Sequence, residues 1–145
     1  MLTARTAKGL EAVEETIFDA GGSATIAPLD LTQTDSIARL ATAIGERWAA
    51  LDVMVLNAGM LGSLAPVNSI EPREFAQVLT LNVSAPVALI SAFDPMLRKA
   101  KAAKGVGITS SVGRTPRAYW GAYGASKAAF ETLIGADGDE TVEIC

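Results

Sequence analysis

The stretch Leu51-Asp52-Val53-Met54-Val55-Leu56-Asn57-Ala58-Gly59 decides the fold class of this chain. Its first six residues are almost wholly apolar, which is typical of a short strand that is buried on both faces of a sheet. An amphipathic helical pattern comes before it, with one apolar face made of Ile37, Leu40, Ala41, Ile44 and Trp48. A helix followed by such a strand predicts an α/β unit.

The same alternation continues on both sides of this stretch. Residues 24–31 and 105–110 are predicted to be strands, and residues 1–5 the end of another. Four helices are expected, with a Thr6 cap, a Thr32–Asp35 capping pair, a long helix from Pro72 and a last helix over residues 123–133. Right-handed crossovers then predict a doubly wound parallel sheet with flanking helices. Because no linker or repeat is found, residues 1–145 are interpreted as one domain.

The composition excludes several kinds of site. The chain has 145 residues, no histidine and one cysteine, Cys145, so imidazole catalysis, a disulfide framework and a cysteine-based or histidine-based metal site are excluded. A net charge of −4 argues against nucleic acid as a partner. No signal-peptide pattern and no run of about 18 apolar residues is found, so we expect a cytoplasmic protein without a membrane span.

Polar and small residues follow three of the predicted strands. They are Asp30, Asn57-Ala58-Gly59 and Ser110-Ser111-Val112-Gly113. Ligands of parallel α/β sheets bind at the carboxyl ends of the strands, and glycine there allows a close approach to the backbone. For Asn57-Ala58-Gly59 alone, an ordinary turn is an equally good interpretation.

Two residues of the last predicted helix suit acid–base chemistry. Tyr123 and Lys127 lie four residues apart and therefore on one helical face. A neighbouring ammonium favours the phenolate and lowers the phenol pKa towards a useful range. Ser110, at the end of the adjacent predicted strand, is placed to meet the same substrate oxygen. The alternative for the pair alone is a packed tyrosine beside a solvated lysine.

Taken together, these residues resemble the short-chain dehydrogenase/reductase family. The matches follow the family's order and spacing from about Arg5 to about Ile134, and they are Asn57-Ala58-Gly59, Leu81-Asn82-Val83, Ser110 with Gly113, and Tyr123-x-x-x-Lys127 within "YGASKAAFE". The resemblance implies a Rossmann-type fold. It also implies hydride transfer between a nicotinamide cofactor and a small-molecule carbonyl or alcohol.

The resemblance assigns four catalytic positions. Tyr123 is implied as the general acid/base, Ser110 (with Ser111 as fallback) as the partner of the reacting oxygen, and Lys127 as the group that lowers the phenol pKa and holds the nicotinamide ribose. Asn82 is implied to complete a proton relay. Pro86 has no N–H, so the carbonyl of Asn82 is free to hold a water or the lysine. The alternative is a proline kink that only fits the helix around the core.

The implied cofactor-binding residues are Arg5, Asp30, Asn57, Ala58, Gly59, Tyr123 and Lys127. Arg5 favours NADP(H) over NAD(H), because a guanidinium binds two oxygens of a 2′-phosphate at once. Asp30 corresponds to a family position beside the adenine. Each of these two could instead be a solvated surface charge.

The chain also departs from the family pattern. The Gly-rich turn that cradles the pyrophosphate has no counterpart in residues 1–145, and the sequence stops after the Tyr123 helix. We therefore expect a central fragment whose sheet splits into two pairs or closes across the place of a central strand. Such a fragment is expected to bind no dinucleotide tightly and to fold poorly alone.

Two other functions remain open on the sequence. One is a non-catalytic remnant that acts through the helices with which the family pairs its subunits, since the complete protein is expected to be a homodimer or homotetramer. The other is a serine hydrolase with Ser110 or Ser111 as nucleophile and Lys127 as base. The hydrolase is disfavoured because Thr109 stands where a nucleophile elbow needs glycine.

Overall fold

The computed structural model describes residues 1–142, so Cys145 lies outside the described residues. Strands and helices alternate as the sequence predicts, in the order β1 (Leu2–Ala4), α1 (Ala7–Asp19), β2 (Ile26–Pro28), α2 (Thr34–Arg47), β3 (Val53–Leu56), α3 (Pro72–Leu79), α4 (Ala85–Leu97), β4 (Lys104–Gly107) and α5 (Gly121–Val142). Three short turns complete the order, a 3-10 turn at Val67–Ser69, a π-helical turn at Thr80–Ser84 and a 3-10 turn at Ser111–Gly113.

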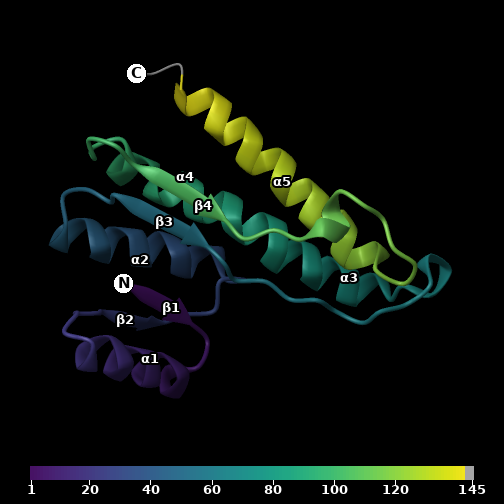
Figure 1. The fold of residues 1–145 in the computed structure, drawn as a ribbon, viewed down its shortest axis with the longest axis horizontal. Helices are drawn as coiled ribbons and strands as arrows, with labels where there is room; N and C mark the ends of the chain where they lie inside the picture. Colours follow the sequence, from purple (N-terminus) through teal and green to yellow (C-terminus); the bar gives the residue numbers. More distant parts are fainter. Residues whose placement is uncertain (143–145) are drawn as a thin grey trace.

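The strands of the described residues form two separate parallel pairs. In one pair β1 lies beside β2, with Thr3 opposite Ala27, and in the other β3 lies beside β4, with Val55 opposite Val106 (Figure 1). In the Rossmann strand order the first strand separates the second from the fourth. The two observed pairs match the strands on either side of that place, so the predicted split of the sheet is confirmed.

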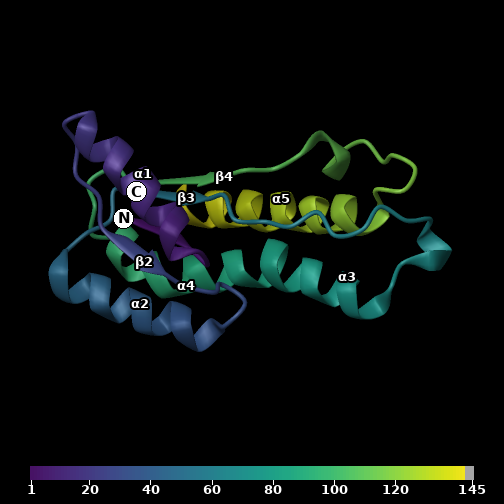
Figure 2. The same ribbon diagram turned by 90° about the horizontal axis from the view of Figure 1, so that it is seen from below.

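Helices α2 and α4 cover one side of β3. Ile44 of α2 packs with Phe93 and Met96 of α4, and Met54 of β3 packs against this cluster. A second cluster joins Leu31 and Ile37 to Ala85. Both helices lie on the same side of the β3–β4 pair (Figure 2). This packing fixes the carboxyl end of β3, where Asn57-Ala58-Gly59 begins, against the long helical region.

The long helical region runs from Pro72 to Leu97 and contains the π-helical turn. In that turn the Ala85 N–H donates to the Thr80 carbonyl, five residues earlier. Pro86 has no N–H, so the ordinary helical hydrogen bond to the Asn82 carbonyl cannot form. The π-helical turn lies next to this missing bond. The region is long and apolar enough by composition to cross a membrane, although it contains no unbroken apolar run. This property was not predicted from the sequence, where a membrane span was expected to need about 18 consecutive apolar residues.

The predicted helix starts need two corrections. Thr6 precedes α1, but its side chain makes no capping hydrogen bond. Helix α2 begins at Thr34 with Gln33 as its N-cap, so the predicted Thr32–Asp35 capping pair is wrong. Instead, the Thr32 N–H and hydroxyl donate to the Asp30 carboxylate at 3.0 and 2.8 Å, respectively. The threonine side chain thus bonds back to the preceding turn, which competes with capping.

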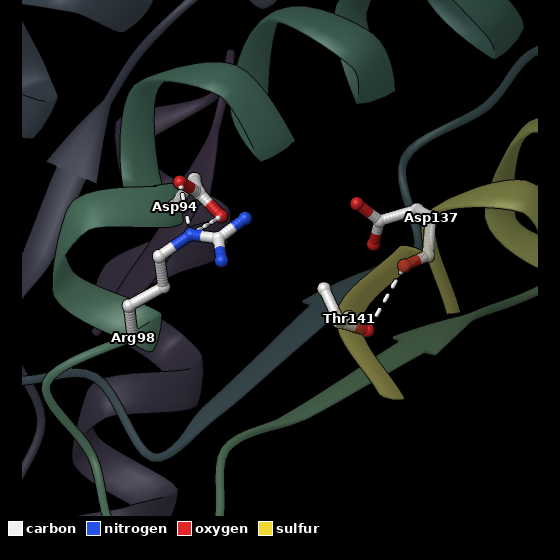
Figure 3. Close-up of polar contacts among 4 residues, drawn as sticks. All are labelled: Asp94, Arg98, Asp137 and Thr141. Carbon is white, nitrogen blue, oxygen red and sulfur yellow. Dashed lines mark hydrogen bonds and ion pairs between the residues drawn. The ribbon is translucent and has the colours of Figure 1, made fainter. Parts of the chain in front are cut away.

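The carboxyl-terminal ends of α4 and α5 carry a group of polar residues. This group lies away from the carboxyl ends of the strands. The Arg98 Nε donates to both carboxylate oxygens of Asp94, at 2.8 and 2.7 Å. Figure 3 shows Asp137 of α5 across from this pair, with its carbonyl accepting from the Thr141 hydroxyl at 2.9 Å. The pKa of Arg98 is raised, chiefly by the Asp94 hydrogen bond and further by the charges of Asp94 and Asp137.

Candidate functional site

Three of the four predicted catalytic residues line one pocket. Ser110 follows β4, and Tyr123 and Lys127 come from α5, yet all three border the same cavity of about 340 Å³. Its apolar wall consists of Met60, Leu61, Ile108 and Trp120. Ser111 is exposed and does not line the pocket. The geometry therefore favours Ser110 over the fallback serine.

Lys127 is buried beside the tyrosine ring. Its side chain is only 5% exposed, and its Nζ lies 5.8 Å from the centroid of the Tyr123 ring. The ammonium donates to the Ile108 carbonyl at 2.7 Å. The ammonium does not hydrogen-bond the Asn82 carbonyl. Holding the lysine was one of the two roles predicted for that carbonyl oxygen, and the other was holding a water. Burial lowers the pKa of Lys127, and the Glu131 carboxylate acts in the opposite direction.

Asn82 holds two parts of the site together through its side chain. Its Oδ1 accepts from the Met60 N–H at 2.8 Å, and its Nδ2 donates to the Met60 carbonyl at 2.8 Å and to the Ser126 Oγ at 2.9 Å. The Ser126 hydroxyl donates in turn to the Tyr123 carbonyl at 2.7 Å. Asn82 and Ser126 are fully buried. The asparagine thus connects the loop after β3 to the helix of the predicted acid–base residue.

Close backbone contact between the Ser111–Gly113 turn and α5 depends on two glycines. A Cβ at Gly113 would lie 3.0 Å from the Ala128 nitrogen and the Lys127 carbonyl carbon. A Cβ at Gly124 would lie 2.9 Å from the Val112 carbonyl oxygen. Without side chains at these positions the turn rests directly on the helix, and Ser110 is brought next to the helix that carries Tyr123.

The segment before α5 contains one backbone position with positive φ. Tyr119 has φ of 72°, a value that non-glycine residues rarely adopt. Its carbonyl accepts from the Ala65 N–H at 3.1 Å, which joins this segment to the loop after β3. The next residue is Trp120, whose ring centroid lies 6.1 Å from that of Tyr123. The strained residue thus lies at the point where the apolar wall of the pocket is completed.

The predicted cofactor residues line a second, adjoining cleft of about 570 Å³. Arg5 and Asp30 border it together with Asn57, Ala58 and Gly59, and it shares Asn57, Gly59 and Met60 with the pocket that Ser110, Tyr123 and Lys127 line. A Cβ at Gly59 would lie 3.3 Å from the Asn82 Oδ1 and 3.7 Å from the Lys127 Nζ. The glycine therefore keeps open the junction between the two cavities.

The cleft is lined by two charged residues, Asp30 and Arg5. The hydrogen bonds from the backbone and side chain of Thr32 lower the pKa of Asp30, and the charge of Arg5 lowers it further. Arg5 itself forms no ion pair with a carboxylate of residues 1–142. One cationic and one anionic side chain thus border a cleft of a size that small-molecule sites commonly have. Within residues 1–142 no group of acidic or cysteine side chains is placed to hold a metal ion.

Three residues of this region were not predicted from the sequence. Ser126 stands three residues after Tyr123 and could have been noticed from its place in the quoted motif, whereas Met60 bonds Asn82 only through backbone atoms and gives no side-chain signal. Glu131, one helical turn beyond Lys127, accepts from Thr109 and Arg114. These bonds join segments far apart in the sequence, and single-sequence patterns do not record such pairs.

Comparisons with known proteins show the family and the fold. Residues 1–143 match the family model described as short chain dehydrogenase. The uncharacterised oxidoreductase YciK of Escherichia coli is 38% identical over 107 residues, which cover 74% of this chain and 42% of that protein. Sorbitol dehydrogenase of Cereibacter sphaeroides is 31% identical over 130 residues, covering 89% and 50%, respectively. The crystal structure of a metagenomic short-chain oxidoreductase in complex with NADP has a TM-score of 0.91 and 36% identity, covering 98% of this chain and 64% of the other.

An α/β chain of parallel strands with this helix order has the Rossmann-type fold of its structural relatives. The chain belongs to the short-chain dehydrogenase family. It spans about half the length of the curated relatives it matches.

Proposed function

We propose that the protein transfers hydride between NADP(H) and the carbonyl or alcohol group of a small molecule. The observation that carries this proposal is the pocket in which Ser110, Tyr123 and Lys127 meet. A hydroxyl, a phenol and an ammonium around one cavity can bind a carbonyl oxygen, exchange its proton and stabilise its charge. The adjoining cleft shares Asn57, Gly59 and Met60 with this pocket, so a cofactor bound in the cleft would reach the same residues.

Each of the three residues has a distinct task in this proposal. The bound nicotinamide supplies or accepts the hydride. The Tyr123 hydroxyl gives the proton to the substrate oxygen or takes it back, while the Ser110 hydroxyl donates to the same oxygen. Lys127 has three N–H donors, of which one binds the Ile108 carbonyl, so two remain for ribose hydroxyls. Its Nζ lies 5.8 Å from the centroid of the Tyr123 ring, so the ammonium and the phenol are neighbours in the pocket.

Asn82 supports the site chiefly by its side chain. Its three hydrogen bonds hold Met60 and Ser126 in place, and through Ser126 they reach the first turn of the Tyr123 helix. The proton relay that the family resemblance implies for Asn82 stays a prediction. The π-helical turn around it supports that role, because its bonding pattern departs from that of a regular helix.

For the cofactor, we propose NADP(H) rather than NAD(H). Arg5 borders the cleft without an ion-pair partner among residues 1–142, so its guanidinium is available to a 2′-phosphate. The metagenomic relative was crystallised with NADP, which supports the same choice. In the complete gene product, Arg5→Ala should weaken NADPH binding far more than NADH binding. Equal weakening for the two cofactors would show that Arg5 does not bind the phosphate.

The decisive experiment replaces the acid–base group. In the complete gene product, Tyr123→Phe should abolish carbonyl reduction, because only the hydroxyl carries the proton. NADPH binding, followed by fluorescence titration, should stay nearly unchanged because the ring remains. Tyr119→Phe is the matched control, since its side chain is exposed and does not line the pocket. Turnover retained by Tyr123→Phe would remove the tyrosine from the mechanism.

A second candidate is a non-catalytic role in which the chain pairs with another subunit. The observation in its favour is the region Pro72–Leu97, which is apolar and only 22% buried over its most apolar window. We propose that this surface forms the contact of a homodimer or homotetramer, in the cytoplasm, whichever function the site has. The serine-hydrolase alternative has no such support, because the ammonium of Lys127 bonds the Ile108 carbonyl and neither serine.

A further inference from the structure

Glu131 joins the segment after β4 to α5 through both of its carboxylate oxygens. The Thr109 hydroxyl donates to Oε1, and the Arg114 Nε donates to Oε2 at 2.7 Å. Glu131 is one of the less exposed carboxylates, with 19% of its side chain exposed, whereas the Arg114 side chain is 76% exposed. Hydrogen bonds from both partners lower the pKa of Glu131, so it is ionised at neutral pH.

The two partners of Glu131 lie on either side of Ser110. Thr109 directly precedes the serine, and Arg114 follows the 3-10 turn that begins after it. Lys127 fixes the carbonyl of Ile108 just before Thr109. The segment from Ile108 to Arg114 is therefore held at both ends by side chains of one helix. That helix also carries Tyr123.

Glu131 is also part of the charge environment of Lys127. The two residues are one helical turn apart, and the carboxylate opposes the effect of burial on the pKa of the lysine. Tyr123 on the same helix and Arg114 after the 3-10 turn are the other titratable groups close to this pair. Asn82, which faces the lysine from the π-helical turn, is neutral.

We propose that Glu131 is a positioning residue of the active site, which clamps the segment carrying Ser110 to the helix carrying Tyr123 and Lys127. The inference rests on the proposed function only where it regards Ser110 and Tyr123 as reacting groups. The clamp itself is a structural statement about residues 109–114 and 131. It can therefore be tested without cofactor or substrate.

The first measurement is amide hydrogen exchange in residues 109–114. Glu131→Ala should speed exchange there by roughly tenfold, because two charge-assisted bonds are lost. Asp94→Asn is the matched control, since it removes another carboxylate–arginine pair (Figure 3), which lies at the end of α4 and makes no contact with residues 109–114 that would change their exchange. Thr109→Val removes one bond without altering α5 and should give a smaller increase. Exchange that stays at the wild-type rate in Glu131→Ala would overturn the clamp.

The second measurement separates positioning from mere support of the fold. The pKa of Lys127 is followed by NMR titration of its Cε resonances in the wild type and in Glu131→Gln, which keeps an acceptor for Thr109 but removes the charge. We expect the pKa of Lys127 to fall in the variant, because burial is then unopposed. An unchanged lysine pKa would overturn the electrostatic part of the proposal. Neither readout depends on Tyr123 as acid–base, so failure of the proposed function would be seen separately.

Discussion

Asn82→Ala should be among the most destabilising single substitutions outside the apolar core. The side chain is 1% exposed and makes three hydrogen bonds of 2.8 to 2.9 Å. Each hydrogen bond contributes about 0.5–1.5 kcal/mol net to the free energy of unfolding. The loss of all three would therefore lower that free energy by roughly 4.5 kcal/mol at most. Removing the amide leaves the Met60 N–H and carbonyl without their protein partner.

Two features of the surroundings reduce this limit. The Ser126 hydroxyl keeps its bond to the Tyr123 carbonyl and is therefore not left without a partner. Met60 is only partly buried, so water can replace part of the lost bonding to its backbone. We therefore expect a loss of about 2–3 kcal/mol in the free energy of unfolding. Such a loss is large compared with the total stability of a typical domain, about 5–15 kcal/mol.

The assay is urea unfolding followed by the fluorescence of Trp48 and Trp120. The matched control is Asn68→Ala, because Asn68 is exposed and makes one bond of 3.2 Å with the neighbouring Ser69. The control should change the free energy of unfolding by less than about 0.5 kcal/mol. If Asn82→Ala lost no more stability than the control at an equal m-value, the connecting role of Asn82 would be refuted.

Two more predictions concern the contact between α5 and the Ser110 segment. Gly124→Ala should lower the free energy of unfolding by about 1–3 kcal/mol, because its Cβ would lie 2.9 Å from the Val112 carbonyl oxygen. Gly135→Ala is the control, since no atom lies within 4 Å of its Cβ. It should raise the free energy of unfolding by about 0.5–1 kcal/mol in the same assay. The lowered pKa of Glu131 means that its contribution to stability is present above its unfolded pKa and is lost as the pH falls through the lower folded value. Exchange in residues 109–114, corrected for the intrinsic rate, should therefore accelerate selectively in acid for the wild type and not for Glu131→Gln, and identical acid profiles would contradict this.

The sequence predicted the order of elements and the meeting of the site residues because these follow from local patterns. Apolar runs, helical periodicity and the placement of Asp30, Asn57 and Ser110 after strands each depend on neighbours in the chain. In a parallel sheet, residues that follow strands gather at one edge. In the structure Arg5 and Asp30 border one cavity, and Ser110 and Tyr123 border another. The catalytic and binding roles of these residues stay predictions.

The remaining details depend on which of several polar partners a group bonds, and the sequence patterns do not contain that information. Thr32 has the spacing of a capping residue, yet its hydroxyl donates to Asp30. Lys127 lies beside the Tyr123 ring, as expected, but its ammonium donates to the Ile108 carbonyl and not to the carbonyl of Asn82. In both cases a polar group had several acceptors within reach. The choice between them is made by packing that the sequence does not display.

Strand β3 is not buried on both faces, contrary to the prediction from its apolar sequence. Its exposed and buried residues can be compared by substitution within the same strand. An apolar run predicted burial on both faces, but Val53 and Val55 are 52% and 57% exposed, whereas Leu56 is 5% exposed. Leu56→Ala should therefore cost about 2–5 kcal/mol in the free energy of unfolding, and Val55→Thr less than about 0.5 kcal/mol. The exposed side chains of Val53 and Val55 should also bind the dye ANS. The double variant Val53→Thr, Val55→Thr should therefore show less ANS fluorescence than the wild type. A loss from Val55→Thr as large as that from Leu56→Ala would mean that this face of the strand is covered in solution.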